Sequence, residues 1–595
     1  MADDPAAAPT GWRTLLTHAR RHWRAYALGV VALALVDTID GVLAPWLKGA
    51  AFANLERGED LRWSCAAIGA AFAAAALIQL GLRYAWRHYF IKTADRIGGE
   101  VREGLFRRIQ SLPLHRLDRT PSGDLMSRMT NDLNEVRTAT GLGFLLSADS
   151  ALYLLCVVPQ LVWLSPRLAA TTALALPLVA LLVWWGGRIV HARATVVQER
   201  LSALSGQLQE SFSGARVVKA FAAEPREQAR FEELARAYLG GQLDLARFQS
   251  AYGPSLSLVF DVAHFVAIGL GGREVLLGRL SLAELVVWLS AFDKIVWPMM
   301  AIGMVSGMLQ RGAAAQARID QVLAEAADPA APPPPLPAGE PALTGAVSVE
   351  GLTFSYPGGD PSRPPVLQDV SFQAAPGSFV AIVGPIGSGK STLLSLLARL
   401  YEPPPGTIRL DGRDLLDLPP AALRRDLALV PQEAFLFSTT IEENVALGRN
   451  GLLERAAIEE ACRAARVDAE VRELPDGYRA LLGERGVNLS GGQRQRLTIA
   501  RALARAPRLL LLDDALAAVD VETEAGIARA VRDRLGPTRI VVTHRISAVQ
   551  EADQILVLDR GRIVERGTHA ELLARGGTYA RLCRLERLEQ EVARG

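Results

Sequence analysis

The sequence is poor in the residues that mark several common classes of protein. Only four of its 595 residues are cysteines, and they are too widely spaced to form a CxxC metal pair or a disulfide framework. Aromatic residues make up 6% of the chain, and basic and acidic residues nearly balance, at a formal net charge of +2. The composition therefore excludes a disulfide-rich scaffold, and no overall basic charge indicates a nucleic-acid partner.

Hydrophobic residues, by contrast, make up half of the chain, and the long apolar stretches precede one proline-rich segment. Seven prolines lie between Pro329 and Pro341. Because each proline lacks an N–H group and fixes φ, this segment can neither continue a helix nor join a central strand, and we interpret it as an extended linker. We predict a cytosolic N-terminus with an interfacial helix (1–24), a membrane domain (25–325), the linker (326–345) and an α/β domain (346–595).

The apolar stretches before the linker have the length of membrane spans. A helix needs about 20 residues to cross the hydrocarbon core, and six stretches come close to that length. The loops on the side of both termini are rich in Lys and Arg, which is typical of the cytoplasmic side. The acidic first residues do not resemble a signal peptide, so we expect the first span to be retained, in a multi-pass protein of the cell membrane with both termini and the α/β domain in the cytoplasm. The six stretches are Ala25–Leu47, Ser64–Tyr84, Gly141–Leu164, Leu168–Val190, Leu256–Gly272 and Leu285–Leu309.

The α/β domain contains a phosphate-binding pattern. The apolar run Phe379–Val383 predicts a strand, Leu393–Leu400 predicts a helix, and a GxxxxGK[ST] motif lies between them. Glycines let backbone N–H groups close around phosphate oxygens, the lysine reaches the β- and γ-phosphates, and the following hydroxyl can bind Mg²⁺. We therefore expect ATP and Mg²⁺ as cofactors, held by Gly384, Pro385, Ile386, Gly387, Ser388, Gly389, Lys390, Ser391 and Thr392.

Two carboxylates follow a second apolar run, Leu509–Leu512. Asp513 and Asp514 would then lie at the carboxyl end of a strand, beside the phosphate loop. The first carboxylate suits Mg²⁺ and the second suits a base for the attacking water.

These motifs, with the LSGGQ sequence at Leu489–Gln493, resemble those of ATP-binding cassette (ABC) transporters, in particular exporter half-transporters. The resemblance implies a membrane α-helical domain of six transmembrane helices with long cytoplasmic extensions, and an α/β P-loop ATPase domain of the ABC type. It also implies that two half-transporters hold ATP between their nucleotide-binding domains, and that hydrolysis drives export of a cargo across the membrane.

The resemblance also assigns roles to single residues. Tyr356 matches the aromatic residue that stacks on adenine, and Asp520 matches the loop after the magnesium aspartate. The signature residues that would contact ATP held by the opposite chain are Ser490, Gly491, Gly492 and Gln493. The expected catalytic residues are Asp514, His544 and Gln432, and the expected metal ligands are Ser391, Gln432 and Asp513.

The chain departs from the family pattern at Asp514, where the family usually has glutamate. The carboxylate is one methylene shorter, and a misplacement of about 1 Å can cost on the order of a hundredfold in rate. Because the base is impaired and the signature is intact, we predict that this chain pairs with a different half-transporter that has its own glutamate. The ATP site of that partner would then use the signature of this chain. The alternatives are a homodimer in which Asp514 suffices, with His544 and Gln432 positioning the water, and an ATP-gated or regulatory subunit.

Ionisable residues inside the predicted spans suggest where cargo could bind. Such groups are costly in a membrane and normally face a bundle interior or water. An acidic cavity wall would favour cationic or zwitterionic cargo, whereas structural pairing between helices would explain the same residues. The motifs are shared by exporters of drugs, lipids and peptides, so we expect only an amphipathic cargo. The candidate cavity residues are Asp37, Asp40, Asp261, His264 and Asp293.

Overall fold

The structure is a computed structural model that describes residues 11–57, 61–173, 175–328, 339–360, 362–447, 453–483, 486–516, 519 and 521–594. The chain divides into two compact units. Unit 1 comprises Met1–Ile109 and Gly123–Glu325, and unit 2 comprises Gln110–Ser122 and Ala326–Gly595. The short segment Gln110–Ser122 therefore belongs with the α/β part of the chain, although α4 ends at its first residue and α6 begins at its last.

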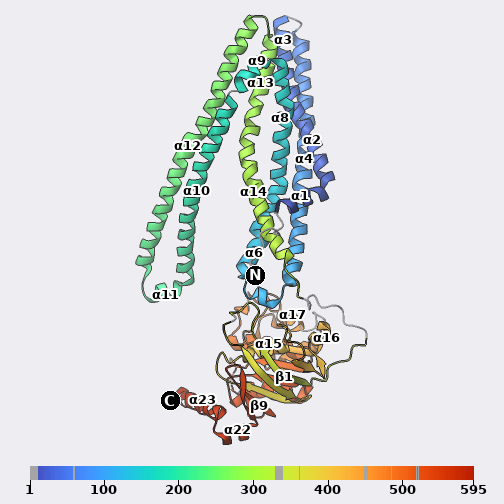
Figure 1. Ribbon diagram of the computed structural model, residues 1–595, viewed down its shortest axis with the longest axis vertical. Helices are drawn as coiled ribbons and strands as arrows, with labels where there is room; N and C mark the ends of the chain where they lie inside the picture. The colour runs from blue at the N-terminus through green and yellow to red at the C-terminus, as the bar shows by residue number, and fades with distance from the viewer. Residues whose placement is uncertain are drawn as a thin grey trace. The chain divides into compact units, whose positions relative to one another are not determined.

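The described part of unit 1 is helical (Figure 1). Three π-helical turns join successive helices without a loop, so that Trp23–Asn54 and Ser122–Leu164 each follow one continuous helical path. The α-helices are α1 (Gly11–Arg21), α2 (Trp23–Thr38), α3 (Ala44–Arg57), α4 (Leu61–Gln110), α6 (Ser122–Ser127), α7 (Leu133–Thr138), α8 (Phe144–Leu164), α9 (Pro166–Ala173), α10 (Ala175–Ser213), α11 (Ala215–Ala220), α12 (Glu224–Leu276), α13 (Leu282–Phe292) and α14 (Val296–Ala324). The π-helical turns are η1 (Ile39–Leu43), η2 (Arg128–Asp132) and η3 (Ala139–Gly143), and η4 (Asp293–Ile295) is a 3₁₀ turn.

Five helical segments within the described residues are long and apolar enough to cross a membrane. They run over Trp23–Asn54, Ala66–Gln110, Ser122–Leu164, Glu224–Leu276 and Leu282–Ala324. The remaining stretch predicted from the sequence, Leu168–Val190, falls on α9 and α10 and contains residue 174, which lies outside the described residues.

Helices α10 and α12 lie side by side as a long hairpin that α11 closes at one end (Figure 1). Large apolar side chains near α11 are exposed: Phe212 is 75% exposed, Val217 61% and Phe221 80%. In contrast, Trp288 of α13 is fully buried, and its indole Nε1 donates to the carbonyl oxygen of Leu161 at 3.2 Å. Unit 1 thus has a packed interior around α13, while the end of its hairpin has no apolar cover within the described residues.

Unit 2 is built around two β-sheets. In the larger sheet the strand order is β10-β9-β3-β8-β7-β6, with parallel pairing from β9 to β6 and an antiparallel β10 at the edge. The smaller sheet, β2-β1-β4-β5, is antiparallel. The strands are β1 (Val347–Phe354), β2 (Leu367–Ala374), β3 (Phe379–Val383), β4 (Ile408–Leu410), β5 (Arg413–Asp414), β6 (Leu427–Val430), β7 (Leu509–Asp513), β8 (Thr538–Val542), β9 (Gln554–Asp559) and β10 (Arg562–Gly567).

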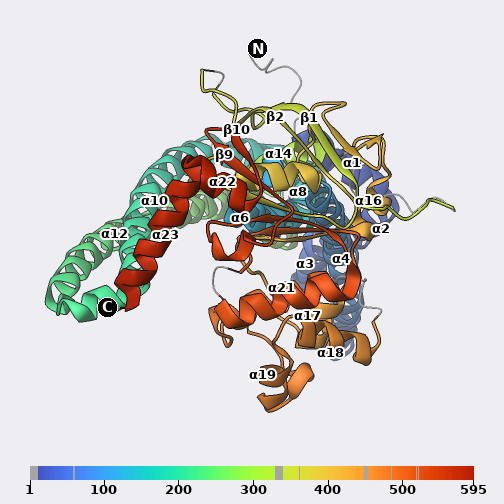
Figure 2. The same ribbon diagram turned by 90° about the horizontal axis from the view of Figure 1, so that it is seen from below.

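Parallel strands β3, β7 and β8 are adjacent, so their carboxyl ends meet at one edge of the sheet, where ligands of open α/β sheets bind. Helices α17, α18 and α19 gather away from β1 and β2 (Figure 2). The helices of unit 2 are α5 (Leu114–Leu117), α15 (Lys390–Leu397), α16 (Pro420–Asp426), α17 (Ile441–Ala446), α18 (Arg455–Ala464), α19 (Asp468–Glu473), α20 (Gly491–Ala504), α21 (Val521–Leu535), α22 (His569–Arg575) and α23 (Thr578–Arg594), with 3₁₀ turns η6 (Gly477–Arg479) and η8 (Ser547–Val549).

Candidate functional site

The phosphate loop connects the carboxyl end of β3 with the N-terminus of α15, as the sequence predicts. Two of its glycines are required by the space around them. A Cβ at Gly384 would lie 2.0 Å from the carbonyl oxygen of Leu558, and Gly389 has φ +103°, with the side chain of Leu367 2.8 Å from the position of a Cβ. These two positions of the loop therefore require glycine, because a side chain would collide with Leu558 or Leu367.

Lys390, the first residue of α15, points its ammonium back into this loop. Its Nζ donates to the carbonyl oxygens of Gly384 at 2.8 Å and Pro385 at 2.7 Å. Burial lowers the pKa of Lys390, an effect that the nearby carboxylates of Asp514 and Asp513 oppose. Because carbonyl oxygens are neutral, an anionic oxygen in the loop would be a better partner for this buried cation.

Ser391 and Asp513 meet at the same edge of the sheet. The Ser391 hydroxyl Oγ donates to Asp513 Oδ1 at 3.1 Å. Burial raises the pKa of the Asp513 carboxyl, while the hydrogen bond from Ser391 acts in the opposite direction. One hydroxyl and one carboxylate suit Mg²⁺, which usually takes one or two carboxylates and completes its shell with water and substrate phosphates. The described residues contain no group of three or more His, Cys, Asp or Glu side chains that could hold a metal alone, so the pair fits an ion that binds together with a nucleotide.

Asp514 has an unusual backbone and a fixed side chain. Its φ is +47°, in the left-handed region that Asp tolerates better than most residues, and its N–H donates to the carbonyl oxygen of Val542 at 2.8 Å. Its Oδ2 lies 2.9 Å from His544 Nδ1, and its Oδ1 accepts from the Thr543 hydroxyl at 3.4 Å. Because an ionised carboxylate only accepts, this contact places a proton on Nδ1 of His544.

Tyr356 lies beside α15. Its hydroxyl shares a hydrogen bond of 2.8 Å with the hydroxyl of Thr392, and its side chain is 37% exposed. One end of the ring is therefore fixed to the helix that follows the phosphate loop, while part of the ring stays accessible for stacking.

The signature residues form the N-terminus of α20. Ser490 caps this helix: its hydroxyl accepts from the N–H of Gln493 at 3.2 Å, and the Gln493 side-chain oxygen accepts from the N–H of Ser490 at 2.8 Å. Within the part of the chain that the structure describes, no hydrogen bond or ion pair joins Ser490–Gln493 to the phosphate loop. The signature therefore leaves its helix N-terminus open to another ligand.

Of the two remaining predicted site residues in unit 2, only Gln432 lies within the described residues. Gln432 follows β6 with an exposed side chain, and its carbonyl oxygen accepts from Gln495 Nε2 at 3.5 Å. Asp520 lies outside the described residues.

Most of the ionisable residues singled out in the membrane spans have partners in neighbouring helices. Asp40 accepts from Tyr153 at 2.7 Å and from Lys294 at 3.0 Å, and His264 lies 3.1 Å from Asp293. Asp37 differs, because it is only 1% exposed and its Oδ2 has no hydrogen-bond partner. Asp261 is exposed.

Two hydrogen bonds close to the candidate residues were not predicted from the sequence. Thr543 stands in the same Val-Thr-His-Arg motif as His544 and could have been included, since it contacts the predicted base. Asp149 of α8 accepts from the indole Nε1 of Trp297 at 3.0 Å. The sequence could have indicated Asp149, because, like Asp37, it is a carboxylate within an apolar span.

Comparison with known proteins shows the family of the chain. Residues 26–299 match the family model "ABC transporter transmembrane region", and residues 367–517 match "ABC transporter". The chain is 34% identical to the probable multidrug resistance ABC transporter ATP-binding/permease protein YheI of Bacillus subtilis, over 94% of this chain and 95% of that protein. The chain belongs to the ABC transporter family. This ABC transporter is also 35% identical to the multidrug resistance-like ATP-binding protein MdlA of Escherichia coli, over 96% of this chain and 95% of that protein.

A lipid A-core flippase and an exporter of known structure are similar over almost the same length. The ATP-dependent lipid A-core flippase of Nitrosococcus oceani is 32% identical, over 97% of this chain and 95% of that protein. A solved structure of a bacterial Atm1-family ABC exporter with ATP bound has a TM-score of 0.76 and 29% identity, over 96% of this ABC transporter and 98% of that chain. The chain is thus a multi-pass ABC exporter with its membrane and nucleotide-binding domains fused, and its ATPase is coupled to transport.

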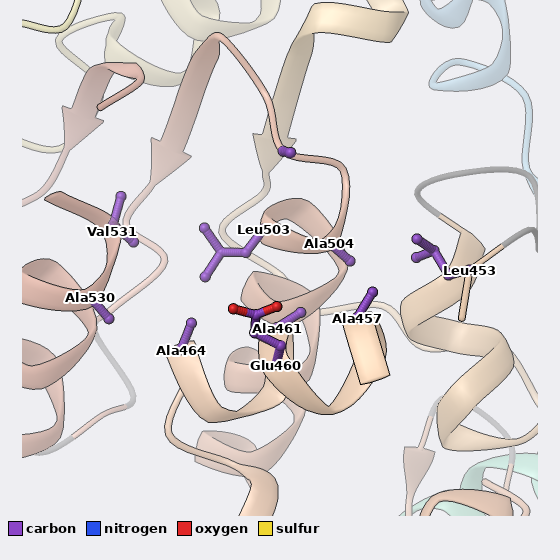
Figure 3. Close-up of a pocket in the computed structure, with 10 residues that line it drawn as sticks. Leu453, Ala457, Glu460, Ala461, Ala464, Leu503, Ala504, Ala530 and Val531 are labelled. Carbon is purple, nitrogen blue, oxygen red and sulfur yellow. The ribbon is translucent and has the colours of Figure 1, made fainter. Parts of the chain in front are cut away.

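A separate pocket of about 350 Å³ lies between α18, α20 and α21 of this ABC transporter (Figure 3). Its walls are mainly small apolar side chains, with the carboxylate of Glu460 among them. None of the nucleotide-motif residues lines this pocket, so it is distinct from the phosphate site. The lining residues are Leu453, Ala457, Glu460, Ala461, Ala464, Leu503, Ala504, Ala506, Ala530 and Val531.

Proposed function

We propose that this chain is one half of a heterodimeric ABC exporter, in which it contributes an intact signature and a slow ATP site. The observation that carries the proposal is the contrast between Asp514 and the signature. The base position has a short carboxylate that contacts His544, whereas Ser490 and Gln493 cap α20 in an unbroken signature.

In this proposal the phosphate loop of the chain holds the triphosphate of ATP. The Lys390 ammonium exchanges its carbonyl partners for phosphate oxygens, which removes the cost of a buried cation with neutral acceptors. Ser391, Asp513 and the side chain of Gln432 would hold Mg²⁺, which would supply positive charge beside the phosphates. Tyr356 stacks on the adenine.

Hydrolysis at this site needs a base that reaches the water in line with the γ-phosphate. Asp514 is one methylene shorter than glutamate, so its carboxylate is drawn back by about the length of one C–C bond, 1.5 Å. Its hydrogen bonds to His544 and Thr543 also hold it near β8. We infer that ATP remains bound at this site through many turnovers of the other site.

The other site would consist of a partner's phosphate loop and this chain's Ser490, Gly491, Gly492 and Gln493. A helix N-terminus with free N–H groups is a good partner for a phosphate anion. The partner half-transporter would supply a glutamate base of its own. This arrangement gives the chain a role in hydrolysis that does not depend on Asp514.

We propose an amphipathic cargo, which agrees with the names of the multidrug resistance and lipid A-core flippase relatives. Asp40, His264 and Asp293 have structural partners, so they are weaker candidates for cargo recognition than Asp37. If Asp37 recognises cationic cargo, Asp37→Asn will reduce ATP-driven uptake of a cationic amphiphile into inverted vesicles. Unchanged uptake would remove Asp37 from the cargo site and leave the ATPase assignment intact.

The test of the heterodimer is the ATPase rate of the chain purified alone in lipid bilayer discs. We expect binding of Mg-ATP with turnover close to the background of a Lys390→Ala control, because both sites of a homodimer would carry Asp514. Brisk, vanadate-sensitive turnover by the chain alone would support the second candidate, a homodimeric exporter. The contact of 2.9 Å between Asp514 and His544 is the observation that favours this alternative, since it gives the carboxylate a fixed orientation.

A further inference from the structure

A pocket of about 470 Å³ lies in unit 1, where α1 meets the helices α8 and α14. Sites for small molecules usually have volumes of about 300–1,000 Å³ and a mainly apolar lining with a few polar groups. This pocket has that size and that kind of lining. The lining includes Trp12 of α1, Ser147, Ser150 and Leu154 of α8, and Val305 and Gln310 of α14.

The two long walls of the pocket belong to helices that can cross the membrane. α8 and α14 are parts of Ser122–Leu164 and Leu282–Ala324, which are long and apolar enough to span a bilayer. The helices run antiparallel, because Gly143 lies beside Leu309 whereas Asp149 accepts from Trp297. The pocket therefore extends along the two helices from Trp12 at one end, and an occupant can enter it from the bilayer.

Helix α1, which supplies Trp12, is fixed against α14. A Cβ at Gly11 would lie 2.0 Å from the carbonyl oxygen of Ala313, so glycine lets the two backbones touch. The Thr14 hydroxyl donates to Asp320 Oδ2 at 2.7 Å. Because α1 is the helix that the sequence predicts at the cytoplasmic interface, and tryptophan favours that depth, the Trp12 end of the pocket lies at the level of the lipid headgroups.

Ser150 contributes a buried hydroxyl to this pocket. The residue is only 6% exposed, and none of the described residues forms a hydrogen bond with its Oγ. The neighbouring hydroxyl of Ser147, in contrast, donates to the carbonyl oxygen of Gly143 at 2.7 Å. A buried hydroxyl without a partner is costly, so Ser150 favours an occupant with an oxygen atom that can accept its hydrogen bond.

The lining also selects against charge. None of the described residues that line the pocket is charged, so a phosphate or an ammonium group inside it would be buried without a counter-ion. An acyl ester meets both requirements, because its carbonyl oxygen can accept from Ser150 and its chain can lie beside Leu154 and Val305. Glycerolipids of the bilayer carry such esters at the boundary between headgroups and acyl chains.

We propose that this pocket binds one acyl chain of a glycerolipid from the cytoplasmic leaflet, with the ester carbonyl at Ser150 and the headgroup outside, beside Trp12. The lipid is a resident ligand rather than cargo, and it joins α1 to α8 and α14. The proposal goes beyond export and does not depend on the proposed heterodimer, because every residue it uses belongs to unit 1 of a single chain.

The experiment uses the full chain in bilayer discs made of a dialkyl ether phosphatidylcholine, which supplies chains without carbonyl oxygens. The discs contain increasing mole fractions of a diacyl phosphatidylcholine with a diazirine in one chain, and the labelled peptides are identified by mass spectrometry after illumination. We expect the ester lipid to be preferred about fivefold over the ether lipid in the pocket, the effect of one net hydrogen bond. Labelling around Leu154 and Val305 should therefore saturate. Leu80 of α4, which is 69% exposed, is the reference for ordinary lipid contact and should be labelled in proportion to the mole fraction.

Two serines of the same helix provide a matched pair of variants. Ser150→Ala should remove the preference for the ester lipid, whereas Ser147→Ala should keep it, because the Ser147 hydroxyl already donates to Gly143. Val305→Trp should fill the pocket and reduce labelling around Leu154 while labelling of Leu80 stays unchanged.

Three results would overturn the proposal. The first is labelling of the pocket in simple proportion to the mole fraction, as at Leu80, which would mean ordinary contact with the bilayer only. The second is a preference for the ester lipid that survives Ser150→Ala. The third is loss of labelling in an excess of the cationic amphiphile of the uptake assay, which would make the pocket part of the cargo route rather than a site for a resident lipid.

Discussion

The replacement Asp514→Glu tests the central proposal, because it restores the missing methylene and changes nothing else in the side chain. The added C–C bond extends the reach of the carboxylate by about 1.5 Å. A misplacement of about 1 Å costs on the order of a hundredfold in rate, which corresponds to about 2.7 kcal/mol of activation free energy. We therefore expect the ATPase rate of the chain purified alone to rise about a hundredfold in the variant.

The backbone at Asp514 sets a small cost against this gain. With φ at +47°, the position suits Asp better than Glu, and we expect the variant to lose up to about 1 kcal/mol of folding stability. Glutamate also moves its oxygens away from the 2.9 Å contact with His544. The expected loss of folding stability is smaller than the expected gain in activation free energy. Thermal unfolding, measured beside ATP turnover, should therefore separate the change in stability from the change in rate.

The assay is phosphate release from Mg-ATP by the chain in bilayer discs, with vanadate-treated samples as the background. Asp514→Asn is the matched control, because it has the length of the native residue without a basic oxygen, and it should be no faster than the native chain. The reasoning is refuted if the native chain already hydrolyses ATP briskly, with Asp514→Asn abolishing and Asp514→Glu barely changing the rate.

Three further changes test other parts of the site. Burial raises the pKa of Asp513, so as the pH falls this carboxylate becomes protonated earlier than an ordinary aspartate does. We therefore expect Mg²⁺-dependent ATP binding to weaken as the pH is lowered through this raised pKa. An affinity that stays constant down to the ordinary aspartate range would contradict this. Gly389→Ala should abolish ATP binding and lower the free energy of unfolding by more than about 1 kcal/mol, because φ is +103° and the new Cβ would collide with Leu367. Normal binding of trinitrophenyl-ATP would show that the loop can rearrange. Ser490→Ala should lower the free energy of unfolding by about 1 kcal/mol, because the cap of α20 is lost. It should leave the ATP affinity of the isolated chain unchanged and remove the ATPase activity of an assembled heterodimer. A weakened ATP affinity in the isolated chain would contradict the proposed place of the signature.

The sequence predicts those parts of the site that lie close together along the chain. The phosphate loop, the Asp513-Asp514 pair and the Ser490–Gln493 cap are each short segments whose residues specify their own backbone, so a motif identifies both their structure and their chemistry. Parallel pairing of β3, β7 and β8 then brings the phosphate loop and the two aspartates to one edge of a sheet.

Contacts between distant residues could not be predicted in the same way. Tyr401 and Asp118 are 283 residues apart, and Lys294 and Asp40 are 254 residues apart. Each of these residues has many possible partners of opposite charge or hydrogen-bonding type, and only tertiary packing selects one. Within the membrane spans the pattern identified costly residues, but packing decided that Asp40 is paired and that one oxygen of Asp37 is not.

The hairpin of α10 and α12 has a consequence for how much transporter a cell can make. Its end exposes Phe212 and Phe221 to more than 70% each, at 75% and 80%. Surfaces of this kind are normally covered by a partner, and a copy that finds none presents them to chaperones and proteases. In the proposed heterodimer the scarcer chain would then set the number of finished complexes, and surplus copies of the other chain would be degraded. Equal synthesis of the two chains would therefore follow from the apolar end of one hairpin.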